Sequence, residues 1–203
     1  EYGSWAGGAF AIAIGVLPAI ALLAMLAVPR AERDRPGVRA FVVVAAGAVV
    51  GFGWYAAVKG AYLSTTFSSL IVERNLVYLA PLAFVATAYL LERATAPVWA
   101  VLVAGAAVLG LIVWVPIERG LDNFPYYEAH GLAILALANR DLHWTAQRIE
   151  HALVVISLLG GAALVGCPRS RGEPDDPRDV LRARASPALV AAAVDQRHER
   201  HAL

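Results

Sequence analysis

Five long apolar runs, separated by short charged segments, dominate this 203-residue chain. Runs close to 20 apolar residues match the hydrocarbon thickness of a lipid bilayer. Lipid offers no hydrogen-bond partner to a bare backbone amide, so each run is predicted to be a helix. We therefore expect an all-α, polytopic bundle of about five transmembrane helices, formed by Trp5–Val28, Ala40–Val58, Leu76–Leu91, Ala96–Ile117 and Ala152–Val165.

The composition supports a membrane protein and argues against several other classes. Only 16% of the residues are charged, whereas a soluble domain holds about 25%. The net charge of +1 provides no basic field, so no nucleic-acid partner is expected. The single cysteine, Cys167, cannot form an internal disulfide. No phosphate-binding loop, dinucleotide-binding glycine motif or zinc-protease motif occurs, and we expect neither a cofactor nor a metal.

The arginines in the loops predict the orientation in the membrane. They cluster in the first loop, Pro29–Arg39, and again at the start of the tail after Cys167. Both segments are therefore expected in the cytoplasm, which places the N-terminus outside and the C-terminus inside. The loops Lys59–Asn75 and Glu118–His151 then lie on the outer face.

Two predicted domains follow from a change in composition near Cys167. Residues 1–167 form the transmembrane domain, whereas the tail 168–203 is rich in Pro, Gly, Asp and Arg and is expected to be disordered. The chain begins at Glu1 rather than Met, and we interpret it as a fragment of a longer protein whose N-terminal part is missing.

Smaller features refine this prediction. Pro18 and Pro81 lie inside apolar runs and are expected to kink their helices. Gly131–Asn139 is apolar but too short to span, so we expect a re-entrant or interfacial helix. The last helix can begin as early as Trp144, ahead of its apolar run.

The strongest candidate site is Glu73-Arg74-Asn75, directly before the third apolar run. The planar guanidinium of arginine donates two parallel hydrogen bonds to anionic oxygens. Arg74, at the outer lipid boundary, is therefore a candidate contact for a lipid-linked phosphate, and Lys59 is a second candidate. The alternative is that these charges only mark helix ends by reaching the interface.

Other polar groups are weaker candidates. The hydroxyls of Ser64–Ser69 can serve a sugar or phosphate, or can cap helices. Glu118 and Asp122 can act as acid and base, or simply solvate a helix end. A metal site needs three or four converging ligands, and the spacing of the histidines does not predict convergence; they are His130, His143, His151, His198 and His201.

The segment Glu73–Leu82 resembles a recurrent piece of bacterial polytopic glycosyltransferases of the GT-C class, which include dolichyl-phosphate-mannose and lipid A aminoarabinose transferase-like proteins. In these proteins an Arg-bearing, Pro-containing aromatic helix opens at the outer face in the C-terminal half. Asn75 stands where Tyr is commoner. The resemblance implies the C-terminal membrane portion of an enzyme that moves a sugar from a polyprenyl-phosphate carrier to an extracytoplasmic acceptor.

The same resemblance implies roles for individual residues and a location in the bacterial plasma membrane. Arg74 would contact the lipid-linked phosphate, and Glu73 would orient Arg74. The catalytic acidic residues of such enzymes lie in the first outer loop, upstream of Glu1, so no catalytic residue is assigned here.

Two alternatives remain open at this point. A transporter or flippase fragment is expected to carry ionisable residues in the middle of its helices, and these runs have essentially none. A non-catalytic membrane scaffold would instead depend on its cytoplasmic tail to recruit a partner.

Overall fold

The computed structural model describes residues 1–66, 71–93, 96–118 and 129–166, all within a compact unit, Glu1–Arg169. All regular structure in these ranges is helical, which confirms the predicted all-α fold. The predicted disordered tail, 168–203, lies outside the described residues.

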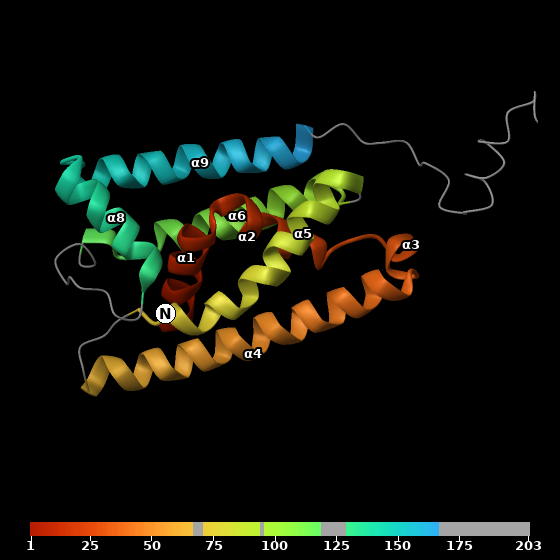
Figure 1. Ribbon diagram of the computed structural model, residues 1–203, viewed down its shortest axis with the longest axis horizontal. Helices are drawn as coiled ribbons and strands as arrows, with labels where there is room; N and C mark the ends of the chain where they lie inside the picture. The colour runs from red at the N-terminus through yellow and green to blue at the C-terminus, as the bar shows by residue number, and fades with distance from the viewer. Residues whose placement is uncertain (67–70, 94–95, 119–128, 167–203) are drawn as a thin grey trace, which may run out of the picture. The chain divides into compact units, whose positions relative to one another are not determined.

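The described part of the chain forms, in order along the sequence (Figure 1), α1 (Tyr2–Ile14), α2 (Val16–Met25), α3 (Arg30–Arg33), α4 (Pro36–Thr66), the 3₁₀ helix η1 (Arg74–Leu79), α5 (Ala80–Arg93), α6 (Val98–Val113), α8 (His130–Asp141) and α9 (Ala146–Gly166). Within the part of the chain that the structure describes, three helical segments are long and apolar enough to cross a membrane, or four if the pair α1–α2 counts as one span. Helix α6 is apolar but shorter, at 16 residues. The three segments are Pro36–Thr65, Arg74–Arg93 and Ala146–Gly166.

The first predicted span, Trp5–Val28, is not one continuous helix. It breaks at Gly15, where the chain bends by 116° between α1 and α2. Gly15 has φ 86° and ψ 141°, a conformation open essentially to glycine alone. Pro18, which was predicted to kink a helix, instead lies in the first turn of α2, where its missing N–H has no intrahelical partner to lose.

This bent pair forms the core of the bundle. α1 packs against α4, α6 and α8, and α2 packs against α5, α6 and α9. Ala6, Ala9, Ile20 and Ala21 are completely buried, which lets the neighbouring backbones approach closely. Figure 1 shows α4 and α9 on opposite sides of the pair. The sequence therefore builds the interior from its first apolar run.

By contrast, α4 exposes much of its apolar surface. It has 31 residues and is about 46 Å long at 1.5 Å per residue, enough to cross the hydrocarbon core and reach the headgroups on both sides. Its exposed side chains include Val50, Trp54, Tyr55 and Tyr62. A surface of this kind suits contact with lipid tails.

The second predicted kink, at Pro81, coincides with a change of helix type. The chain is a 3₁₀ helix from Arg74 to Leu79 and becomes α-helical at Ala80. A proline has no N–H and collides with the carbonyl four residues earlier, so an α-helix cannot run through it undisturbed. Pro81 instead occupies the first turn of α5.

Candidate functional site

The geometry of η1 decides which way each residue of the candidate site faces. A 3₁₀ helix has three residues per turn, so residues three apart lie on one row. Glu73, Leu76 and Leu79 are all less than 5% exposed, at 2%, 4% and 3%. Arg74 and Val77 occupy the next row and are exposed. The carboxyl group is therefore buried because it continues the buried row of η1.

The buried carboxylate of Glu73 is bound to the start of α8. Its Oε2 accepts a hydrogen bond of 2.8 Å from the backbone N–H of Gly131. The first amides of a helix have no carbonyl partner within it, and the helix dipole favours a negative charge there. The local N-cap residue of α8, Ala129, provides no side-chain cap. Glu73 thus caps α8 from a distant part of the chain.

Gly131 is required for this contact by close packing. A Cβ atom on Gly131 would lie 2.5 Å from the carbonyl oxygen of Ala9 and 2.9 Å from the Cβ of Ala13, both in α1. Any larger residue would push α8 away from α1. The start of η1, the first turn of α8 and the middle of α1 therefore meet around the Glu73 carboxylate.

Burial changes the acidity of Glu73. Desolvation raises its pKa from 4.5 to about 7, and the hydrogen bond from Gly131 opposes this rise without cancelling it. The reason is that burial disfavours the ionised form more than one backbone N–H can stabilise it. Glu73 therefore changes its protonation state close to neutral pH.

Asn75 provides a second unusual polar group in the same segment. Its side-chain Nδ2 is buried and has no hydrogen-bond partner among the described residues. A buried donor without an acceptor costs about 1–3 kcal/mol, so this amide is an unfavourable feature of the local packing. One turn further on, Tyr78 is exposed and stacks on Phe52 of α4, with ring centroids 5.8 Å apart.

The residues predicted to bind a phosphate lie on different elements. Arg74 is exposed at the first position of η1, and Lys59 is half-buried in the second half of α4. The Glu73 carboxylate accepts a hydrogen bond from the backbone N–H of Gly131. The predicted role of Glu73 in orienting Arg74 stays a prediction.

The weaker candidates divide between structural contacts and undescribed positions. The hydroxyls of Ser64 and Thr65 donate to the carbonyls of Ala61 and Tyr62 within α4, at 2.8 Å and 2.7 Å. These two hydroxyls therefore satisfy their own helix. Other predicted candidates lie outside the described residues: Ser68, Ser69, Asp122, His198 and His201.

The remaining histidines and acids do not gather into a metal site. His130, His143, His151 and Glu118 are all exposed. Within the ranges that the structure describes, no three His, Cys, Asp or Glu side chains are placed to hold a metal ion.

Sequence reasoning missed the roles of Gly131 and of the Asn75 amide. The three-residue spacing of Glu73, Leu76 and Leu79 is a signal that can reveal the burial of Glu73, provided that a 3₁₀ helix is considered. Its partner cannot be found in this way, because Gly131 lies 58 residues further along the chain.

Comparison with known protein families, with characterised proteins and with solved structures finds no match to this chain.

Proposed function

We propose that this chain is part of an integral membrane glycosyltransferase that moves a sugar from a polyprenyl-phosphate carrier to an extracytoplasmic acceptor. In this proposal it lies in a bacterial plasma membrane, with its N-terminus outside and its C-terminus in the cytoplasm. The observation that carries the proposal is the exposure of Arg74 at the first residue of the span Arg74–Arg93.

The burial of Glu73 supports a fixed direction for Arg74. Because Glu73, Leu76 and Leu79 occupy the buried row of η1, the helix cannot rotate without exposing them. Arg74 then stays on the outward row at the end of a span, the depth at which the phosphates of lipid-linked donors lie. A guanidinium in that position is suited to bidentate binding of phosphate.

The neighbouring apolar side chains add to this argument. The exposed apolar side chains of η1 and α5, among them Val77, Tyr78 and Phe84, lie along the same span and offer a surface for the polyprenyl chain.

Binding of a polyprenyl phosphate to the purified chain in nanodiscs tests the proposal. Arg74→Ala should weaken binding roughly ten- to hundredfold, because a charge-assisted hydrogen bond contributes about 1.5–3 kcal/mol. Arg74→Lys should restore only part of the affinity, since an ammonium keeps the charge and loses the planar fork. Arg140→Ala, an exposed arginine of α8, is the matched control. Equal affinity of Arg74→Ala and the native chain would remove the assignment.

A transporter or flippase is a second candidate, favoured by the broken pair α1–α2. Transporters often bind their substrates at discontinuous helices near the middle of the bilayer, and Gly15 separates two helices whose buried side chains form the core of this bundle. Movement of a fluorescent lipid phosphate between leaflets of proteoliposomes distinguishes the two. Flipping that Arg74→Ala leaves unchanged favours the transporter.

A further inference from the structure

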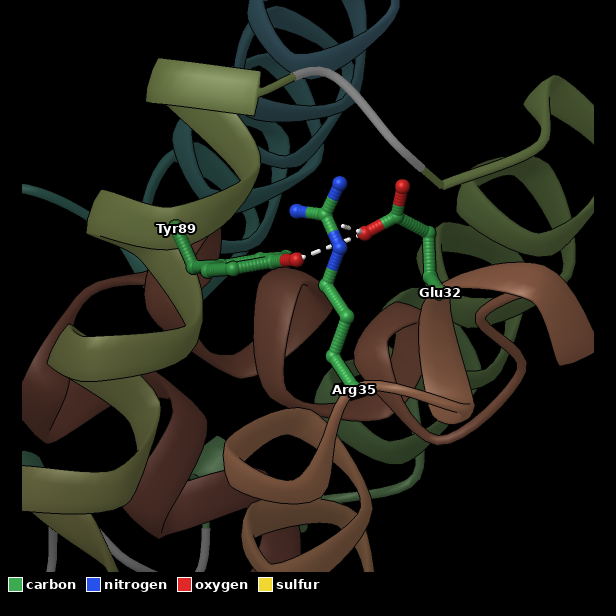
Figure 2. Close-up of polar contacts among 3 residues, drawn as sticks. All are labelled: Glu32, Arg35 and Tyr89. Carbon is green, nitrogen blue, oxygen red and sulfur yellow. Dashed lines mark hydrogen bonds and ion pairs between the residues drawn. The ribbon is translucent and has the colours of Figure 1, made fainter. Parts of the chain in front are cut away.

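The α2–α4 connection contains a small network of polar contacts, shown in Figure 2. The hydroxyl of Tyr89 in α5 donates to Oε2 of Glu32 in α3 at 2.8 Å, and Nη1 of Arg35 lies 3.5 Å from the same oxygen. Arg35 directly precedes α4. The network therefore ties α3, the start of α4 and the last turns of α5 together at one end of the bundle.

Arg33 fixes the same connection to α2. Its Nη2 donates to the carbonyl of Leu26, at the C-terminal end of α2, where the helix leaves its last carbonyls unpaired. Its Nε is buried and has no described partner. The short helix α3 is thus held in place by contacts to α2 and α5.

Several arginines gather around this network, and we name the group the arginine patch: Arg30, Arg33, Arg35, Arg39 and Arg93. Arg35 and Arg93 both lie within electrostatic range of the Tyr89 hydroxyl, which places the end of α5 in the group. The carboxylate of Glu32 is already engaged by Tyr89 and Arg35. Arg30 and Arg39 are exposed, and no described residue pairs with either guanidinium.

The arginine patch lies at the ends of two candidate membrane spans. Arg39 is in the first turns of the span Pro36–Thr65, and Arg93 is the last residue of the span Arg74–Arg93. The Tyr89–Glu32 contact shows that these two ends lie at the same side of the bundle. Charged residues at the ends of spans lie at the depth of the lipid headgroups.

We propose that the arginine patch binds the phosphate groups of anionic phospholipids in the adjoining leaflet. Clusters of four or more basic residues beside a transmembrane helix attract anionic lipids, and guanidinium groups bind phosphate oxygens in a bidentate manner. A lipid phosphate fits better than a soluble one, because the ends of two spans hold the patch at headgroup depth. The proposal does not depend on the glycosyltransferase assignment.

Identifying the lipids that stay bound to the intact chain tests the proposal. The purified protein is placed in nanodiscs that contain equal amounts of phosphatidylcholine and phosphatidylglycerol, and the lipids that stay bound on release are identified by mass spectrometry. The native chain should retain phosphatidylglycerol preferentially. The double variant Arg30→Gln/Arg39→Gln should lower this preference by roughly fivefold for each arginine lost.

Two further variants separate charge at this patch from charge in general. Arg140→Gln/Arg148→Gln removes the same charge from exposed positions of α8 and α9 and should leave the preference unchanged. Arg30→Lys/Arg39→Lys keeps the charge but loses the planar fork, and should retain only part of the preference. A double variant Arg30→Gln/Arg39→Gln that keeps the native preference would overturn the proposal, and so would an equal loss in Arg140→Gln/Arg148→Gln. Displacement of phosphatidylglycerol by millimolar inorganic phosphate would assign the patch to a soluble ligand instead.

Discussion

The carboxylate of Glu73 accepts a hydrogen bond from the backbone N–H of Gly131, although 58 residues separate them in the chain. This contact joins the start of the span Arg74–Arg93 to the first turn of α8. It also holds Glu73 on the buried row of η1, which leaves Arg74 on the exposed row. A structural contact therefore determines the direction of the residue that we propose to bind phosphate.

Removing the acceptor should destabilise the bundle. Glu73→Ala leaves the N–H of Gly131 buried without a partner, which costs about 1–3 kcal/mol. Glu73→Gln keeps an acceptor oxygen in the same position and should cost much less. Thermal or chemical unfolding in detergent micelles at about pH 5, below the raised pKa of Glu73, measures both, with Glu150→Ala, an exposed acid of α9, as the control. Similar losses for Glu73→Ala and Glu150→Ala would contradict the capping role.

The raised pKa of Glu73 predicts that stability falls as the pH rises. The unfolded chain releases this proton near pH 4.5, whereas the folded chain holds it up to about pH 7. Between these values the folded state binds more protons, so the stabilisation present at low pH is lost as the pH rises through 7. The loss is at most about 3 kcal/mol.

Unfolding measured from pH 4.5 to 8.5 checks this dependence. In Glu73→Gln the contribution of this group should be absent, and the variant should be more stable than the native chain at pH 8. A native chain whose stability rises over the same pH range, with Glu73→Gln parallel to it, would refute the prediction.

The sequence predicts those helices that hydropathy alone determines, and it fails where the backbone conformation of a single residue determines the structure. Long apolar runs specify helices in lipid wherever they occur, so α4, α6 and α9 coincide with predicted spans. The break at Gly15 was missed because hydropathy is insensitive to backbone angles. A glycine inside an Ala-rich run reads as a packing residue, and only its positive φ reveals that the chain turns there.

The sequence predicts the position of the candidate site but not its internal contacts. Charges at the head of an apolar run identify Glu73 and Arg74 as residues at a helix end. The burial of Glu73 depends on the 3₁₀ geometry of η1 and on a glycine that only the tertiary fold brings near. Local patterns carry no information on such a distant partner.

Gly131→Ala should disrupt the packing of α8 on α1. The added methyl group would collide with the carbonyl of Ala9 and the Cβ of Ala13, and overpacking of this kind costs about 1–3 kcal/mol. The displaced amide would also lose Glu73. Gly161→Ala in α9, where a Cβ meets no atom within 4 Å, is the matched control and should be neutral or slightly stabilising. Equal melting temperatures of the two variants would show that α8 does not pack as described.

Gly15→Ala should weaken the bent pair at the core. Alanine at φ 86° and ψ 141° is strained by about 1–3 kcal/mol, whatever space surrounds it. Gly47→Ala, in α4 with open space around it, provides the comparison. Unfolding of both variants in micelles measures the difference. If Gly15→Ala proved as stable as Gly47→Ala, the helix would pass through this position without the break.

Cysteine labelling tests the proposed orientation. After Cys167→Ser removes the native thiol, Gly37→Cys and Gln147→Cys place single thiols at exposed positions, one in the first turn of α4 and one in the first turn of α9. The arginines beside Gly37 favour the cytoplasmic side, and α9 begins in the segment assigned to the outer face. In intact cells, a membrane-impermeant thiol reagent should label Gln147→Cys and spare Gly37→Cys, and both should react once the membrane is permeabilised. Labelling of Gly37→Cys alone in intact cells would reverse the orientation and place Arg74 on the cytoplasmic face, away from an extracytoplasmic acceptor.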